Sequence, residues 1–198
     1  MALHKVPEGT VVVAEVQTSG RGRLGREWFS PKGGLWFSVV LRPKTEASEA
    51  AKLVFAASLA VADALGEFCG LHAETKWPND VLVKGKKICG ILAEINSTGK
   101  NVNYAVVGVG LNANFKVKEA LPKEVVETAT SIEDLILDLH HKLNTSAVIV
   151  THQLTTVYKI ADRIVMLHNG KVIEAGTPDE TIRSSDPTIK HFITGKAS

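Results

Sequence analysis

Short apolar runs, separated by glycine, proline and charged turns, dominate the first two-thirds of the chain. Their β-branched and aromatic residues predict buried strands at residues 11–16, 35–41 and 104–109. Two further apolar runs, residues 81–83 and 88–95, flank a glycine-containing turn at residues 84–86 and predict a β-hairpin. Together these segments predict a mixed sheet.

Helical spacing occurs in two places. Between residues 50 and 68 apolar residues recur at helical spacing in an alanine-rich stretch, so this helix is expected to pack closely on a flat surface. Glu46 and Glu49 precede it, where negative charge complements the helix dipole. A second apolar stripe covers residues 132–143, with Ser131 as its expected N-cap and Asp134 answering at the third position.

The final third carries a different series of elements. Residues 147–150 predict an apolar strand, and a short helix follows up to Ala161. Asn169 and Gly170, between two apolar runs, are typical of a hairpin with a type I′ turn. Thr177, followed by proline and then glutamate at the third position, predicts a capped helix. The predicted fold class is α/β, or α+β with a mixed sheet and helices on one face, followed by a C-terminal strand–helix–hairpin–helix unit.

Composition limits the number of domains, the class of partner and the cellular environment that can be expected. The 198 residues, 44% of them apolar, suffice for one generous domain or two small ones. A formal net charge of +2 argues against wholesale nucleic-acid binding. Cys69 and Cys89 match no metal-ligand spacing and are expected as reduced thiols. No run approaches the ~20 apolar residues of a membrane span, and the start has no hydrophobic signal core. We therefore expect a soluble cytoplasmic protein.

The candidate chemistry gathers in residues 17–28, the Arg/Gly loop, where Arg21, Arg23 and Arg26 alternate with glycines. Glycine lets backbone approach a ligand closely, and arginine presents a fixed fork to carboxylate and phosphate oxygens. The pattern favours an anion-binding site, and a solvated, flexible basic loop is the alternative. Lys76 precedes a proline-stiffened turn that would hold its ammonium in place, unless it only snorkels over a tryptophan ring.

Four segments stand in the order found in the catalytic core of biotin protein ligases, also called biotin–[acetyl-CoA-carboxylase] ligases. They are QTSGRGRLGREW (residues 17–28), KWPND (76–80), GILAE (90–94) and GVGLN (108–112). Each alone is weak, but the ordered set is highly specific, so residues 7–131 resemble that core. The resemblance implies an enzyme that uses ATP and Mg²⁺ to convert biotin to biotinyl-5′-adenylate. It then passes the biotinyl group to a lysine of a biotin carrier protein domain.

The same resemblance assigns roles to residues. Lys76 would sit at the biotin carboxylate and the phosphate under attack, and with Arg21 and Arg23 it forms the catalytic set. The Arg/Gly loop would close over the adenylate, and Trp28 would help order the loop and stack near the adenine. Asp80 would help hold the turn of Lys76, and no metal-ligating residue is implied. The implied biotin and adenylate contacts are Gln17, Gly20, Arg21, Gly22, Arg23, Trp28, Lys76, Asn79, Gly90, Ile91 and Asn112.

Residues 131–198 resemble the C-terminal end of an ABC transporter ATP-binding subunit. The matching segments are VIVTH (148–152), ADRI (161–164) and GKVIEAGTP (170–178). His152 matches the switch histidine that senses the γ-phosphate in that family. The phosphate loop, the signature motif and the Walker B acidic pair are absent, so no ATP hydrolysis by this segment is expected. His152 is then a vestigial switch residue, or an ordinary histidine that caps a turn or lies in a loop.

The two resemblances divide the chain into residues 1–130 and 131–198. Relative to the ligase family, the first part lacks the strand and Ser-Thr-Asn stretch that precede the Arg/Gly loop, and also the small C-terminal β-domain. Three interpretations stay open: a biotin protein ligase, which is favoured, an inactive chimera that at most binds biotin or adenylate, and a fragment of a transporter subunit. The expected partner is a biotin carrier protein, without nucleic acid or membrane insertion, and a homodimer is left open.

Overall fold

The computed structural model describes residues 6–49, 51–143, 148, 150, 157–158 and 161–194. Its contacts divide the chain into two compact units, Met1–Leu139 and His140–Ser198. The division falls inside helix α4 (Ile132–Leu143). Leu135 of this helix packs into the core of the first unit.

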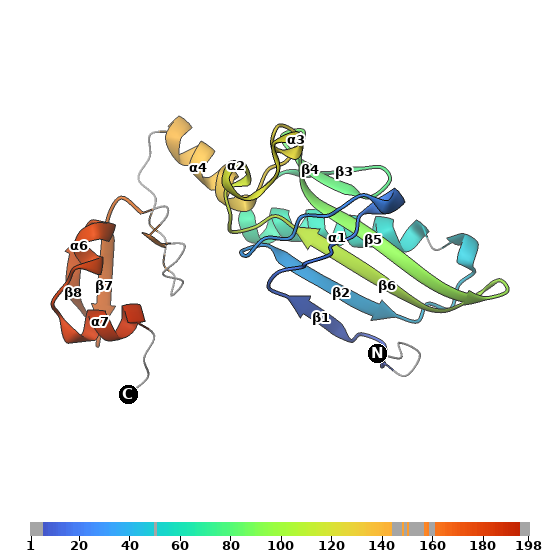
Figure 1. The fold of residues 1–198 in the computed structure, drawn as a ribbon, viewed down its shortest axis with the longest axis horizontal. Helices are drawn as coiled ribbons and strands as arrows, with labels where there is room; N and C mark the ends of the chain where they lie inside the picture. Colours follow the sequence, from blue (N-terminus) through green and yellow to red (C-terminus); the bar gives the residue numbers. More distant parts are fainter. Residues whose placement is uncertain are drawn as a thin grey trace. The chain divides into compact units, whose positions relative to one another are not determined.

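A six-stranded sheet forms the first unit, in the order β1–β2–β6–β5–β4–β3 (Figure 1). Its strands are β1 Val11–Ala14, β2 Leu35–Leu41, β3 Ala73–Lys76, β4 Asp80–Val83, β5 Lys86–Thr98 and β6 Asn101–Leu111. The predicted α+β class is confirmed, but every strand pair in this sheet is antiparallel, where the sequence predicted a mixed sheet. Short turns join β3 to β4, β4 to β5 and β5 to β6, and strands joined by so short a turn must run antiparallel.

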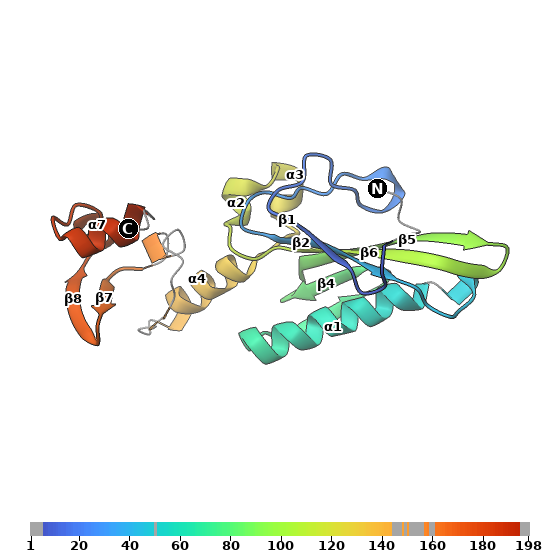
Figure 2. The same cartoon turned by 90° about the horizontal axis from the view of Figure 1, so that it is seen from below.

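Helix α1 (Ala51–Cys69) covers one face of the sheet (Figure 2). Its apolar side packs on the strands around a core of Leu65, Val81, Val83, Ile88, Cys89, Ile91, Val107, Val109 and Leu135. This confirms the expectation that an alanine-rich helix lies closely on something flat. Because side chains alternate along a strand, Val107 and Val109 face α1 while Gly108 and Gly110 face the opposite side of the sheet.

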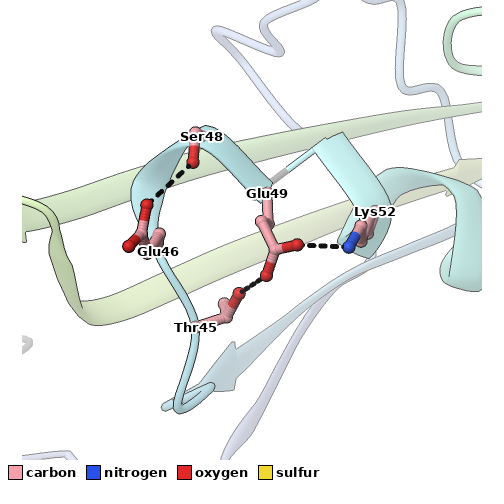
Figure 3. Close-up of polar contacts among 5 residues, drawn as sticks. All are labelled: Thr45, Glu46, Ser48, Glu49 and Lys52. Atoms are coloured by element: carbon pink, nitrogen blue, oxygen red, sulfur yellow. Dashed lines mark hydrogen bonds and ion pairs between the residues drawn. The ribbon is translucent and has the colours of Figure 1, made fainter.

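The acidic residues Glu46 and Glu49 lie in the segment that precedes α1, and the first turn of the helix itself has none. The short 3₁₀ turn η3 (Ala47–Glu49) precedes the helix, and Figure 3 shows Glu49 accepting hydrogen bonds from Lys52 and from Thr45 Oγ1, the latter at 2.6 Å. These bonds, that of Lys52 first, hold the pKa of the Glu49 carboxyl below its usual value. Glu46 accepts a longer bond of 3.4 Å from Ser48.

Strand β1 is not the buried strand that its valines predicted. Val11, Val12 and Val13 are each more than half exposed. The reason is position: β1 is the edge of the sheet and pairs only with β2. No sequence pattern predicted β3, whose residues are AETK, or the short helices α2 (Val117–Ala120) and α3 (Lys123–Val126).

Helix α4 begins as predicted, with a capping residue. Ser131 Oγ accepts a hydrogen bond of 3.0 Å from the backbone N–H of Asp134. The Asp134 carboxylate is used differently from the predicted reciprocal cap, because its Oδ2 accepts the backbone N–H of Val117 at 3.2 Å. The apolar stripe of α4 packs only in part: Leu135 is buried, while Ile136 and Leu139 remain exposed.

The second unit contains the hairpin β7 (Ile164–His168) and β8 (Lys171–Gly176), followed by α6 (Pro178–Ile182) and α7 (Pro187–Thr194). Asn169 and Gly170 have φ of 50° and 74°, as a type I′ turn requires. Thr177 and Glu180 form the predicted capping box. The predicted strand at 147–150 and the helix up to Ala161 rest largely on residues outside the described ranges, as does His152. No helix in the described part of the chain is both long enough and apolar enough to cross a membrane.

Replacing Ser131 with alanine should destabilise the first unit. The hydroxyl is fully buried and satisfies an N–H at the start of α4, and losing such a cap typically costs about 1 kcal/mol. We expect a lower urea midpoint with an unchanged denaturant slope. Ser97→Ala, at an exposed position of β5, is the matched control, and equal midpoints for the two variants would contradict the assignment.

The two thiols should react very differently in the folded protein. Burial raises the pKa of Cys89 to about 12, so at pH 8 it stays protonated, and the thiolate is the reactive form. Cys69 is exposed. Iodoacetamide should therefore modify one thiol in the native protein and the second only after unfolding, as counted by mass spectrometry. Cys69→Ser should abolish the native reaction, and rapid native labelling of Cys89 would refute this account.

Candidate active site

A cleft of about 930 Å³ lies on the face of the sheet opposite α1. Figure 2 shows α1 on one side of the sheet, with α2, α3 and the segment between β1 and β2 on the other. The Arg/Gly loop, the turn at residues 76–80 and residues 121–129 line the cleft, and β5 and β6 form its floor.

One row of cross-strand partners runs beneath this cleft. Lys76 pairs with Asp80, Asp80 with Gly90, Gly90 with Gly110 and Gly110 with Trp36, across β3, β4, β5, β6 and β2. Directly opposed residues present their side chains on the same face of a sheet. Because the two central members are glycines, the floor is bare backbone between Asp80 and Trp36. We refer to Gly90 and Gly110 as the glycine patch.

The indole of Trp28 lies on the glycine patch. A Cβ added to Gly110 would stand 2.5 Å from Trp28 Nε1, and one added to Gly90 would stand 2.9 Å from Trp28 Cζ3. Trp36 meets the same ring edge-on, with 6.3 Å between the ring centroids. The indole N–H of Trp28 is buried and has no acceptor within the described parts of the chain. It is therefore a buried donor whose hydrogen bond is unmade in this structure.

The backbone of the Arg/Gly loop is folded back on itself, although most of its residues are exposed to solvent. Bridges join Gln17 to Ser30 and Arg21 to Glu27, and Ser30 Oγ donates to Gln17 Oε1 at 2.6 Å. Gly20 is required for this closure, because a Cβ there would approach the Trp28 carbonyl oxygen to 2.2 Å.

The arginines of the loop differ in their surroundings. Arg21 Nη2 lies 3.3 Å from Glu94 Oε2 of β5, and both side chains are well exposed. Arg23 starts the short 3₁₀ turn η2 (Arg23–Gly25) at the exposed tip of the loop. An exposed ion pair is weak and exchanges readily, so an anion in the cleft can replace Glu94 as the partner of Arg21.

The turn at residues 76–80 is fastened to the floor of the cleft. Asn79 Nδ2 donates to the Ile91 carbonyl at 3.1 Å, and the Ile91 N–H donates to the Asn79 carbonyl at 2.9 Å. Lys76, at the end of β3, is exposed, and within the described ranges no carboxylate lies in ion-pair contact with it. Its ammonium is thus an uncompensated positive charge at the cleft.

Two of the predicted contact residues belong mainly to the framework of the cleft. The side chain of Ile91 is buried in the core beneath α1, so only its backbone reaches the turn at residues 76–80. Asn112 is also buried, and its Nδ2 donates to the Thr130 carbonyl at 3.0 Å. That bond ties the end of β6 to the segment that leads into α4.

Every predicted contact residue of the first unit lines this one cleft: Gln17, Gly20, Arg21, Gly22, Arg23, Trp28, Lys76, Asn79, Gly90, Ile91 and Asn112. His152 lies outside the described residues. The residue-level prediction did not include Glu94, Lys87 and Gly110, which line the cleft as well. Two of them could have been found from the alternation of side chains along a strand, which places residues two or four apart on the same face. Glu94 shares a face with Gly90, and Gly110 shares a face with Asn112.

Among the described residues, no group of three or more histidine, cysteine, aspartate or glutamate side chains is placed to hold a metal ion. The cleft instead offers arginine, lysine, backbone and indole donors. This donor set suits an anionic ligand better than a bare cation.

Comparisons with known proteins agree with this geometry. The bifunctional ligase/repressor BirA of Bacillus subtilis is 40% identical over 133 residues, which are 67% of this chain and 41% of that protein. The biotin–[acetyl-CoA-carboxylase] ligase of Paracoccus denitrificans is 50% identical over 103 residues, 51% of this chain and 43% of that protein. The chain therefore spans less than half the length of these relatives.

Solved structures show the same fold. The biotin protein ligase of Aquifex aeolicus in complex with biotin and ATP aligns with a TM-score of 0.55 at 34% identity, over 74% of this chain and 57% of that one. The Leishmania major biotin protein ligase in complex with biotin has the same TM-score at 27% identity, over 72% and 58%. A sequence model of the Biotin/lipoate A/B protein ligase family matches residues 1–112, more than half of the 198. The chain belongs to the biotin/lipoate A/B protein ligase family.

Proposed function

We propose that the first unit is the activating core of a biotin protein ligase. The observation that carries the proposal is the convergence of four separate sequence motifs on one cleft, with the glycine patch as its floor. The relatives named above are biotin ligases, and the Aquifex aeolicus structure contains biotin and ATP. Biotin is therefore the favoured substrate within this family.

The proposed reaction has two steps. A biotin carboxylate oxygen attacks the α-phosphorus of ATP, and the bond to the β-phosphate oxygen breaks to release pyrophosphate. The acyl carbon of the resulting biotinyl-5′-adenylate is then attacked by the deprotonated ε-amine of a carrier-protein lysine. AMP leaves with the electron pair of the broken bond. The proposed partner is thus a biotin carrier domain, and both would meet in the cytoplasm.

The first step brings two anions together, so its barrier depends on nearby positive charge. Lys76 supplies an ammonium with no competing carboxylate among the described residues. Arg21 can exchange Glu94 for phosphate oxygens, and Arg23 lies at the loop tip that would close over them. In this arrangement Lys76, Arg21 and Arg23 are the catalytic residues.

The remaining contacts would hold the substrates. The glycine patch and Trp28 offer a flat, largely apolar floor, which suits a small ring system. Gln17, Gly20 and Gly22 would close the loop side, and Asn112 the nucleotide side. Mg²⁺ would arrive bound to the phosphates of ATP, which provide oxygen ligands of the kind that ion prefers.

As a second and separate proposal, residues 131–198 derive from the C-terminal end of an ABC transporter ATP-binding subunit and have no catalytic role. The support is that the ligase family match ends at residue 112 and that the described hairpin carries the GKVIEAGTP segment quoted above.

Lys76→Ala should lower biotin-dependent exchange of labelled pyrophosphate into ATP by roughly 10²–10³-fold, the usual loss on removing one preorganised charge donor. Lys100→Ala, at an exposed turn outside the cleft, is the matched control and should retain full exchange. Undiminished exchange in Lys76→Ala would refute the assigned role.

Calorimetric titration separates an active ligase from an inactive chimera. If the protein is a ligase, biotin alone should bind with measurable heat, and exchange of pyrophosphate should require both biotin and ATP. Heat on binding without exchange would support the inactive chimera, and neither signal would refute the proposed function.

The second proposal predicts that the C-terminal segment hydrolyses no ATP. ATP hydrolysis without biotin should stay at the level of a buffer blank, and His152→Ala should leave pyrophosphate exchange unchanged, because the phosphate loop and Walker B acids are absent. Biotin-independent hydrolysis that is lost in His152→Ala would contradict this proposal.

A further inference from the structure

Two large apolar side chains are left uncovered at the opening of the cleft. Leu24 is 88% exposed and Trp77 is 73% exposed, and both line the cleft. Leu24 belongs to the Arg/Gly loop and Trp77 to the turn at residues 76–80, so they come from different walls. A single exposed apolar side chain is common on a protein surface, but two at one opening indicate a place where another molecule binds.

The backbone of the Arg/Gly loop holds Leu24 at the loop tip. The Gly22 N–H donates to the Arg26 carbonyl at 2.7 Å, and the Arg26 N–H donates to the Arg23 carbonyl at 3.2 Å. Between these bonds Leu24 has φ of 57° and ψ of 34°, a left-handed conformation that is unfavourable for leucine. The tip therefore carries an apolar side chain where glycine or asparagine would be more stable.

Trp77 stands on a backbone that is fixed on both sides. Lys76 pairs with Asp80 across β3 and β4, and the side chain and backbone of Asn79 are both bonded to Ile91. The ring of Pro78 restricts the residue that follows the tryptophan. A tryptophan held in this way offers a large contact area and loses little conformational freedom on binding.

The exposure of these two side chains favours a protein partner over a small substrate. A small ligand is buried mostly within its cleft, so it leaves the side chains at the opening largely uncovered. A protein domain covers the opening itself, and tryptophan is enriched among the residues that dominate binding between proteins. Arg26, on the same loop, is exposed, and within the described ranges no carboxylate lies in ion-pair contact with it. The opening thus offers apolar area beside a positive charge.

We propose that Leu24, Trp77 and Arg26 form a docking surface for the acceptor of the biotinyl group. The partner that fits it is a carrier domain with an apolar patch bordered by acidic side chains, whose lysine then reaches the acyl carbon in the cleft. This inference rests on the proposed function of the cleft. The three residues hold the acceptor and do not touch the reacting atoms, so they act in the second step alone.

The two half-reactions separate docking from activation. With the apo biotin carrier domain of an acetyl-CoA carboxylase as the acceptor, Trp77→Ala should raise the KM for the carrier by roughly tenfold or more, and Leu24→Ser by roughly threefold or more. Pyrophosphate exchange needs no carrier and should stay within about twofold. Transfer of the biotinyl group to hydroxylamine, a small nucleophile that needs no docking, should be equally unaffected.

Phe68→Ala is the matched control. It removes a similarly exposed aromatic side chain (78%) near the end of α1, outside the cleft. The KM for the carrier and both carrier-free reactions should therefore be unchanged.

Ionic strength tests the contribution of charge. The KM for the carrier should rise as salt is added, because complementary charges on the two proteins are screened. Arg26→Gln should weaken this dependence on salt and leave pyrophosphate exchange unchanged. An equal salt dependence in the two proteins would remove Arg26 from the docking surface.

A binding measurement needs no catalysis. After fluorotryptophan labelling, the chain has three reporter side chains, Trp28, Trp36 and Trp77, and Trp77→Phe assigns the third resonance. A carrier domain whose acceptor lysine is replaced by arginine should shift or broaden the Trp77 resonance. The resonance of Trp36, which is buried, should not change.

The outcomes distinguish this inference from the proposed function. In a chain that exchanges pyrophosphate, an unchanged KM for the carrier in the double variant Leu24→Ser, Trp77→Ala overturns the docking surface. An equal loss of pyrophosphate exchange also overturns it, because the side chains would then contact biotin or ATP. Failure of the unmodified chain to bind biotin and exchange pyrophosphate overturns the proposed function instead. A Trp77 resonance that responds to the carrier domain would then still support the docking surface, and a silent one would refute it.

Discussion

The close approach of the Trp28 indole to the paired backbones of Gly90 and Gly110 is the contact on which the rest of the cleft depends. Any Cβ at Gly110 would stand 2.5 Å from the ring, so the indole can lie on the sheet only where two glycines are opposed in register. The end of the Arg/Gly loop that carries this ring is fixed by its backbone, because the Trp28 main-chain N–H donates to the Gly20 carbonyl at 2.9 Å. Loop and floor thus share one point of contact.

Strands β5 and β6 contribute to both the core and the cleft, because successive side chains along a strand point to opposite faces of the sheet. On β6 the valines at 107 and 109 enter the core beneath α1, and the glycines at 108 and 110 face the cleft. A slip of one residue in the pairing would put valines on the floor and glycines in the core. The fold and the site are therefore specified by one register, and helix α1 protects that register from the other face.

Much of this arrangement could be predicted from the sequence, because local patterns determine it. The strand at residues 35–41, the helix at 132–143 and both glycine-containing hairpin turns occur where the patterns placed them. The resemblance to the ligase family named residues that the fold brings together from four segments.

Tertiary context decided what local patterns could not. β1 has the valines of a core strand but lies at the edge of the sheet, and these valines are exposed. The burial of a strand residue depends on the elements packed around it and not on its strand propensity. β3 has the polar sequence AETK and is a strand only because β4 pairs with it. The Lys87–Asp80 pair joins residues from two strands, and Ile91 turns its side chain to the core although its neighbour Gly90 faces the cleft.

The two edges of the sheet are chemically unequal. β3 presents exposed Glu74, Thr75 and Lys76, and charged side chains of this kind discourage another strand from docking. β1 presents only exposed valines and an alanine along its edge. The edge beside Lys76 is therefore guarded by charge, whereas the edge at β1 carries no charged side chain that would oppose strand addition.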